Sequence, residues 1–211
     1  MHVTIIAKAP VAGLVKTRLC PPCTHEQAAN VAAAALSDTF AAVDEVATAT
    51  GARRALLFDG VPQAWMHTGF EIVAQRGDSL GERLRNGFAD LGPGVIIGME
   101  TPHVAGALVD AIHALRRGVD AIGLATDGGY WMIGLTAASV ELRSLVFDDI
   151  PMSASHTGAA QLRRLHSLGC AVRMASIARD LDTFDDLVAV AAARRGGKLG
   201  AVANELTEQL G

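Results

Sequence analysis

The chain has 211 residues with a formal net charge of −4, and 50% of the residues are hydrophobic while 19% are charged. This composition is typical of a globular protein with a sizeable core, and we expect residues 1–211 to form a single domain. An acidic chain without a clustered basic face is not expected to bind nucleic acid. The apolar run 3–7 is too short for a signal peptide, and no stretch has the roughly 20 apolar residues of a membrane span. We therefore expect a cytoplasmic protein that does not bind membranes.

In chain order, strand-like and helix-like segments alternate. The β-branched run 3–7 predicts a buried strand, and Thr24 with Gln27 predicts a capping box for a long helix that Gly51 ends. Short apolar runs predict strands at 55–58, 70–74, 95–97, 121–125, 131–135 and 171–175. Helices are predicted from Asp78 or Ser79 to Leu91, at 103–117 and 158–168, and in two Ala- and Val-rich stretches near the end.

This alternation predicts the α/β class, with a mostly parallel sheet between two layers of helices. The link between 121–125 and 131–135 is too short for a parallel crossover. We therefore expect 131–135 to be an antiparallel strand or to lie in a separate small layer.

The loop after the first strand carries the cations Lys8, Lys16 and Arg18. In α/β folds, ligands bind beyond the carboxyl ends of the strands, where this loop lies. Cations gathered at such a place favour an anion, with phosphate the first choice. A solvated surface role for Lys16 and Arg18 is the alternative.

Acidic residues follow three later strands: Glu100, Asp127 and Asp182. Because parallel strands end at the same edge of a sheet, we expect these acids to face the cationic loop. One or two carboxylates together with substrate phosphates are typical ligands of Mg²⁺ or Mn²⁺. The alternatives are a carboxylate near a helix N-terminus for Glu100, an ordinary turn for Asp127, and a cap of the next helix for Asp180 and Asp182.

Other motifs are weaker. The stretch 10–17 lacks the glycines of a P-loop, and no G-x-G-x-x-G follows a strand. Cys20 and Cys23 stand at C-x-x-C spacing before a helix, which suits thiol redox chemistry, although an incidental pair is the plainer interpretation. No second cysteine pair is present to complete a zinc site, and Cys170 is distant in sequence.

The stretch 8–19 (KAPVAGLVKTRL) resembles the opening signature of a family of uncharacterised transferases. The family is catalogued as DUF2064, or as glycosyltransferases associated with radical-SAM and selenium-related domains. Further blocks match in the family's order at 75–84, 98–102, 126–134 and 180–183. The resemblance covers about residues 3–187.

This family is similar to the GT-A, or nucleotide-diphospho-sugar transferase, superfamily. The resemblance implies a Rossmann-like α/β/α sandwich and a metal-dependent transferase. Its donor would be a nucleoside triphosphate or a nucleotide-sugar, and its acceptor a small molecule of unknown identity. The implied roles are charge neutralisation in the reaction by Lys16 and Arg18; nucleotide binding by Lys8, Ala9, Pro10, Gly13, Lys16, Gln75 and Asp78; substrate binding by Asp127, Gly128, Gly129 and Tyr130; and Mg²⁺ or Mn²⁺ binding by Glu100 and Asp182.

Two departures from the family pattern bear on function. Glu100 stands where the family has Asp, and the extra methylene moves the carboxylate outward by ~1.3 Å. Mg²⁺ tolerates little distortion of its octahedron, so a nucleotide-binding module with little or no turnover is the alternative function. The stretch 150–155 replaces a Trp-Ser-Thr-like element, which affects the acceptor side. The base, the sugar, the acceptor and the oligomeric state are not defined by the sequence.

Overall fold

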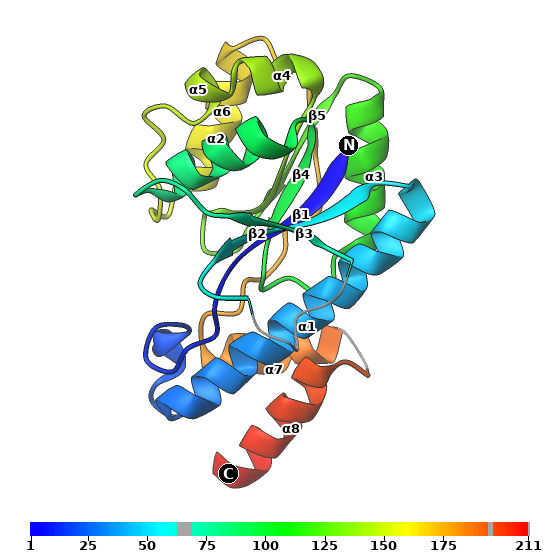
Figure 1. Ribbon diagram of the computed structural model, residues 1–211. Coiled ribbons are helices and arrows are strands. Elements are labelled where there is room, and N and C mark those ends of the chain that lie inside the picture. Colours follow the sequence, from blue (N-terminus) through cyan, green and yellow to red (C-terminus); the bar gives the residue numbers. More distant parts are fainter. Residues whose placement is uncertain (63–68, 194–195, 211) are drawn as a thin grey trace.

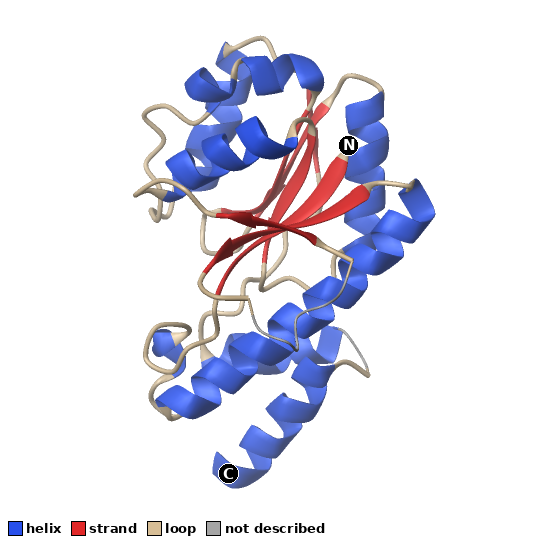
Figure 2. Cartoon of the chain, in the orientation of Figure 1, coloured by secondary structure: helices blue, strands red, loops and turns tan. Residues whose placement is uncertain are grey.

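The computed structural model describes residues 1–62, 69–193 and 196–210, and these form a sheet covered by helices on both faces (Figure 1, Figure 2). The strands are β1 His2–Lys8, β2 Arg53–Asp59, β3 Glu71–Ala74, β4 Gly94–Gly98, β5 Asp120–Leu124, β6 Tyr130–Leu135 and β7 Val172–Met174. The helices are α1 His25–Thr50, α2 Leu80–Leu91, α3 Ala105–Arg116, α4 Ala137–Glu141, α5 Arg143–Val146, α6 Thr157–Ser167, α7 Phe184–Ala193 and α8 Lys198–Leu210, with a 3₁₀ helix at Thr17–Leu19. The predicted α/β sandwich is confirmed. None of the described helices is long and apolar enough to cross a membrane.

The described strands form one sheet in the order β3-β2-β1-β4-β6-β5-β7. β1 pairs in parallel with β2 and β4, whereas β6 is antiparallel to both of its neighbours, β4 and β5. The predicted antiparallel strand therefore lies within the main sheet and not in a separate layer. Because β6 runs in the opposite direction, its first residue, Tyr130, lies at the edge where β1, β4 and β5 end.

Each face of the sheet has its own hydrophobic core. On one face, side chains of β1, β4 and β6 pack against α1 and α3; on the other, they pack against α2, α4 and α6. α1 begins at the predicted capping box of Thr24 and Gln27 and ends at Gly51 in a left-handed conformation. α2 begins at a capping box formed by Ser79 and Glu82. Of the two predicted caps, Ser79 is therefore the one used.

A further hydrophobic cluster lies beside the sheet, where the N-terminal half of α1 meets α7 and α8 (Figure 1). We call it the α1–α8 cluster; its buried residues are Leu19, Cys23, Ala28, Val31, Ala34, Ala35, Leu181, Leu187, Val190, Ala191, Leu199, Ala203 and Leu206. The buried carboxylate of Asp38 on α1 accepts hydrogen bonds from the backbone N–H groups of Lys198 and Leu199, both at 2.9 Å. These bonds satisfy two of the free donors at the N-terminus of α8 and attach that helix to α1.

Candidate functional site

The loop that follows β1 is shaped by two residues with left-handed backbones. Gly13 has a φ of 77° and Lys16 a φ of 51°. This conformation is uncommon for a residue with a side chain, so the surrounding structure must hold Lys16 in it. Directly after Lys16 the chain forms the 3₁₀ turn Thr17–Leu19, and Leu19 is fully buried in the α1–α8 cluster.

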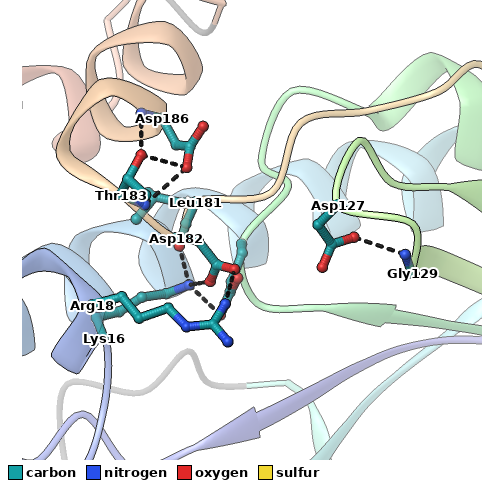
Figure 3. Close-up of polar contacts among 9 residues, drawn as sticks. Lys16, Arg18, Asp127, Gly129, Leu181, Asp182, Thr183 and Asp186 are labelled. Atoms are coloured by element: carbon teal, nitrogen blue, oxygen red, sulfur yellow. Dashed lines mark hydrogen bonds and ion pairs between the residues drawn. The ribbon is translucent and has the colours of Figure 1, made fainter. Parts of the chain in front are cut away.

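Lys16, Arg18, Glu100 and Asp182 meet in one group, which we call the acid–cation cluster. Figure 3 shows Lys16, Arg18 and Asp182 of this cluster. The ammonium of Lys16 contacts the carboxylate of Glu100 and donates to the carbonyl of Leu181. It also lies 3.7 Å from Oδ1 of Asp182, and the Arg18 guanidinium donates to Oδ2 of Asp182 at 2.8 Å. The structure thus brings together the loop after β1, the end of β4 and the segment before α7.

The structural alternatives for the two acids are not realised. Thr183 accepts from the backbone N–H of Asp186, and the Asp186 carboxylate accepts in return from the backbone N–H of Thr183 at 2.8 Å. This pair caps α7 and leaves the side chain of Asp182 to the cations (Figure 3). Glu100 lies five positions before α3, whose N-cap is Val104, and its carboxylate turns to Lys16 instead.

Burial and crowding of negative charge change the acidity of this region. Burial raises the pKa of Glu100, and the nearby Lys16 ammonium opposes that rise. Burial, followed by the charges of Glu100 and Asp127, raises the pKa of Asp180 to about 7. Asp180 was not among the predicted site residues; the signal for it in the sequence is its position two residues before Asp182.

A cavity of about 390 Å³ opens beside the cluster. Its polar lining includes Lys8, Lys16, Gln75, Arg83, Glu100 and Asp180. Its apolar wall comes from β1, β4 and β6, through Ile6, Ile96 and Ile133, and from α2, through Leu80 and Leu84. A cavity lined by both apolar and charged side chains suits a ligand that has a flat or apolar part joined to an anionic part.

Gln75 and Arg83 form a second polar group in this lining. The Gln75 amide donates to the carbonyls of Ala7 at 2.8 Å and Leu57 at 3.0 Å, which ties together the ends of β1 and β2. Its carbonyl oxygen accepts from Arg83 at 3.3 Å. Gln75 was predicted as a site residue and Arg83 was not, although both belong to the matched stretch 75–84.

The other predicted nucleotide-binding residues are placed differently. Lys8 lines the cavity. Ala9, Pro10 and Gly13 lie in the loop after β1 and do not line the cavity. Asp78 is exposed and also outside the lining, and its backbone N–H donates to the Glu82 carboxylate at 2.7 Å.

The segment 127–129 forms a tight turn next to the site. The Asp127 carboxylate accepts from the backbone N–H of Gly129 at 2.8 Å, and Figure 3 shows it apart from the acid–cation cluster. Gly128 has a φ of 91°, and a Cβ at this position would overlap the carbonyl of Ser155. Glycine is therefore required at 128 so that this turn can pack against the segment before α6.

Tyr130 lines the cavity, and its hydroxyl is directed toward α6. It donates to the side-chain oxygen of Gln161 on α6 at 3.4 Å. Burial raises the pKa of Tyr130, so the phenol stays protonated. Its hydroxyl thus links β6 to α6.

The residues present fit a divalent metal ion. Glu100 and Asp182 supply the hard oxygen ligands that Mg²⁺ and Mn²⁺ take, and the Lys16 ammonium between them marks a position that accepts positive charge. In the described ranges, no three His, Cys, Asp or Glu side chains are grouped closely enough to hold a metal ion by themselves. The remaining ligands would have to come from phosphate oxygens and water, as is usual for Mg²⁺.

The cysteine pair gives little support to redox chemistry. Cys20 and Cys23 are both free thiols, and Cys23 is buried in the α1–α8 cluster. Burial raises the pKa of the Cys23 thiol, which disfavours the thiolate that disulfide exchange needs.

Comparison with known proteins relates the chain to a family and its fold to several solved structures. The family model described as "Uncharacterized protein conserved in bacteria (DUF2064)" matches residues 31–154, while no curated protein matches significantly. A proposed nucleotide-diphospho-sugar transferase from Desulfovibrio desulfuricans G20 has a similar structure, with a TM-score of 0.82 and 22% identity over 100% of this chain and 97% of that one.

Two more solved structures are similar at lower scores. Rv0371c from Mycobacterium tuberculosis H37Rv, in complex with manganese, has a TM-score of 0.51 and 20% identity over 90% of this chain and 97% of that one. CMP:2-keto-3-deoxy-manno-octonic acid synthetase, in complex with CTP, has a TM-score of 0.51 and 13% identity over 97% of this chain and 98% of that one. At these identities the likeness establishes a shared fold.

Proposed function

Because the chain belongs to the DUF2064 family and has a fold shared with nucleotide-diphospho-sugar transferase-like proteins, we propose that it is a metal-dependent transferase. Its donor is a nucleoside triphosphate or a nucleotide-sugar, and its acceptor is a small molecule. The observation that carries this proposal is the acid–cation cluster beside the cavity. Arg18 and Asp182 are 164 positions apart in sequence, and their contact at the open edge of the sheet is typical of a ligand site in α/β folds.

The cations provide the phosphate site. Lys16 lines the cavity and Arg18 contacts Asp182 at the exposed rim of the cluster beside it; together they neutralise the charge that develops on phosphate oxygens during transfer. The apolar wall with Gln75 and Arg83 takes the base and ribose. CTP, the ligand in the similar synthetase structure, likewise joins a flat base to an anionic triphosphate.

The acids provide the metal site, as their geometry suggests. Glu100 and Asp182 hold the metal, with the other ligands supplied by the donor and by water. When bound, the metal polarises and neutralises phosphate oxygens. The turn 127–129 and the ring of Tyr130 border the side from which an acceptor approaches.

Two reactions fit these residues. In nucleotidyl transfer, an acceptor oxygen attacks the α-phosphorus and pyrophosphate leaves. In glycosyl transfer, the acceptor attacks the sugar carbon and a nucleoside diphosphate leaves. In the first case the leaving group is made of the β- and γ-phosphates, and in the second it carries the α- and β-phosphates. Lys16 and Arg18 can neutralise either group, so these residues do not separate the two reactions and the released product identifies which one occurs.

The first experiment is a thermal-shift screen against nucleoside triphosphates and nucleotide-sugars, with Mg²⁺ or Mn²⁺. A donor that binds only the folded state raises the melting temperature by mass action. Labelled donors that bind are then incubated with candidate acceptors, and the release of pyrophosphate or nucleoside diphosphate is measured. Arg18→Met should abolish the shift, whereas Arg173→Met, at a surface ion pair with Asp110, should keep it. If no donor shifts the melting temperature, the proposal is wrong.

One observation favours a nucleotide-binding protein without turnover as the second candidate. The Lys16–Glu100 ion pair neutralises one of the two acids that would hold the metal. Metal-independent nucleotide binding, with no turnover gained in Glu100→Asp, would support this candidate.

A further inference from the structure

The side chain of Lys16 is held in the manner of a coordinated cation. An ammonium has three N–H donors, and in the described part of the chain that of Lys16 has three oxygen partners: the Glu100 carboxylate, the Leu181 carbonyl and, at 3.7 Å, the Asp182 carboxylate. The Lys16 side chain is only 6% exposed. Two carboxylates and a carbonyl are also oxygen ligands of the kind that divalent cations take.

Arg18 shows that this enclosure is specific to Lys16. The Arg18 side chain is 75% exposed, and of the two acids it contacts Asp182. Arg18 therefore lies at the rim of the acid–cation cluster, whereas Lys16 fills the space between the carboxylates. Both side chains bring one positive charge to the same cluster, so they form a matched pair for experiment.

We infer that Lys16 is the resident counter-ion of Glu100 and Asp182 in the free protein and blocks these carboxylates against a free divalent cation. The inference rests on the proposed function, because it assumes that the two acids hold the metal. Two cations close together in a partly buried site repel each other. The two carboxylates therefore bind the Lys16 ammonium or the metal ion, and each cation weakens the binding of the other.

A polyphosphate releases this block. Its oxygens offer the Lys16 ammonium new partners, and the flexible four-carbon stem of lysine lets the charge move without a change of the backbone. Lys16 then passes from the carboxylates to the donor's phosphates, and the carboxylates become available. The protein is thereby built to take its metal together with the nucleotide and to bind metal poorly alone.

Binding of Mn²⁺ to the free protein tests the inference. The affinities of wild type, Lys16→Met and Arg18→Met are measured by the EPR signal of free Mn²⁺, with no nucleotide present. Lys16→Met keeps the length of the side chain and removes its charge, so it should bind Mn²⁺ at least about tenfold more tightly than wild type. Arg18→Met removes the same charge at the exposed rim and should stay within about threefold of wild type, because charges in high dielectric interact weakly.

Three results would overturn the inference: equal affinity of Lys16→Met and wild type, equal gains in the two variants, and no Mn²⁺ binding by either variant. Circular dichroism checks that the variants fold. If Lys16→Met does not fold, Lys16→Gln repeats the test, because its amide can still donate to the Leu181 carbonyl.

The outcome is separable from that of the proposed function. Donor binding and product release in the wild type test the function, whereas Mn²⁺ affinity without nucleotide tests the role of Lys16. A wild type that binds Mn²⁺ alone as tightly as Lys16→Met, and that still transfers a labelled donor, would refute only the inference.

Discussion

Leu19 and Leu181 are both fully buried in the α1–α8 cluster, one residue after Arg18 and one residue before Asp182. The apolar packing of these two leucines thus sets the position of the charged residues beside them. The carbonyl of Leu181 is also a partner of the Lys16 ammonium. Packing in one hydrophobic cluster therefore helps to set the spacing of a polar site at the edge of the sheet.

Leu181→Ala should weaken both stability and donor binding. The loss of a fully buried leucine costs about 2–5 kcal/mol of unfolding free energy, to be measured by urea denaturation. The space left by the missing leucine side chain also loosens the segment that carries Asp182, so the rise in melting temperature caused by the donor should become smaller. Leu187→Ala is the control, because Leu187 lies in the same cluster on α7. It should lose comparable stability and keep donor binding; equal loss of binding in both variants would contradict this view.

Asp182 and Asp186 should separate function from stability. Asp182→Asn removes one carboxylate of the acid–cation cluster, and turnover should fall by about 100-fold or more. Its stability should change by less than about 1 kcal/mol, because the pair with Arg18 is exposed. Asp186→Ala removes half of the cap of α7 and should cost about 1 kcal/mol while leaving turnover intact. Steady-state kinetics and urea denaturation of both variants check that the first variant loses turnover and the second loses stability.

Acid should destabilise the fold through His2. The buried imidazole donates from Nε2 to the Gly92 carbonyl at 2.9 Å, and Nδ1 faces the Thr4 hydroxyl at 2.7 Å. Burial lowers the pKa of His2 to about 4, well below the usual 6.5 of an exposed imidazole. Between these values the unfolded chain binds a proton that the folded protein does not, so stability falls as the pH falls.

The expected loss between about pH 7.5 and about pH 5 is about 2 kcal/mol, to be measured by urea denaturation. His2→Gln should reduce this dependence on pH, and His166→Gln, at an exposed position, should keep it. An unchanged dependence in His2→Gln would show that other groups cause the acid lability.

Asp38→Ala should detach α8. The variant leaves the backbone N–H groups of Lys198 and Leu199 without their buried acceptor, at a cost of about 1–3 kcal/mol. Hydrogen exchange should become faster in α8 before it changes in β1. Asp110→Ala, at an exposed ion pair with Arg173, should leave the exchange of α8 unchanged.

Much of the fold was accessible from the sequence because its elements are long and periodic. The capping residues of α1 and the β-branched run of β1 lie where they were predicted. α4 and α5 were missed because helices of five and four residues are too short to show a helical period. Their placement depends on tertiary contacts, such as the bond from the Thr136 N–H to the buried Asp120 carboxylate.

The acid–cation cluster was foreseeable in part. β1 and β4 are parallel neighbours, so a loop after β1 and an acid after β4 must meet at the same edge. The enclosure of the Lys16 ammonium was not foreseeable, because it depends on a left-handed backbone and on the Leu181 carbonyl. Asp78 illustrates the opposite case: once Ser79 caps α2, the residue before the cap is left on an exposed turn.

The distance of 164 positions between Arg18 and Asp182 also has a consequence during synthesis. At about 5–20 residues per second, Asp182 leaves the ribosome roughly 10–30 s after Arg18. A growing chain can pair β1 with β2 and β4 in that interval, but its Arg18 does not yet have its partner Asp182. A chain that ends before Asp182 therefore lacks the Arg18–Asp182 ion pair, and under the proposed function we expect such a chain not to bind the donor.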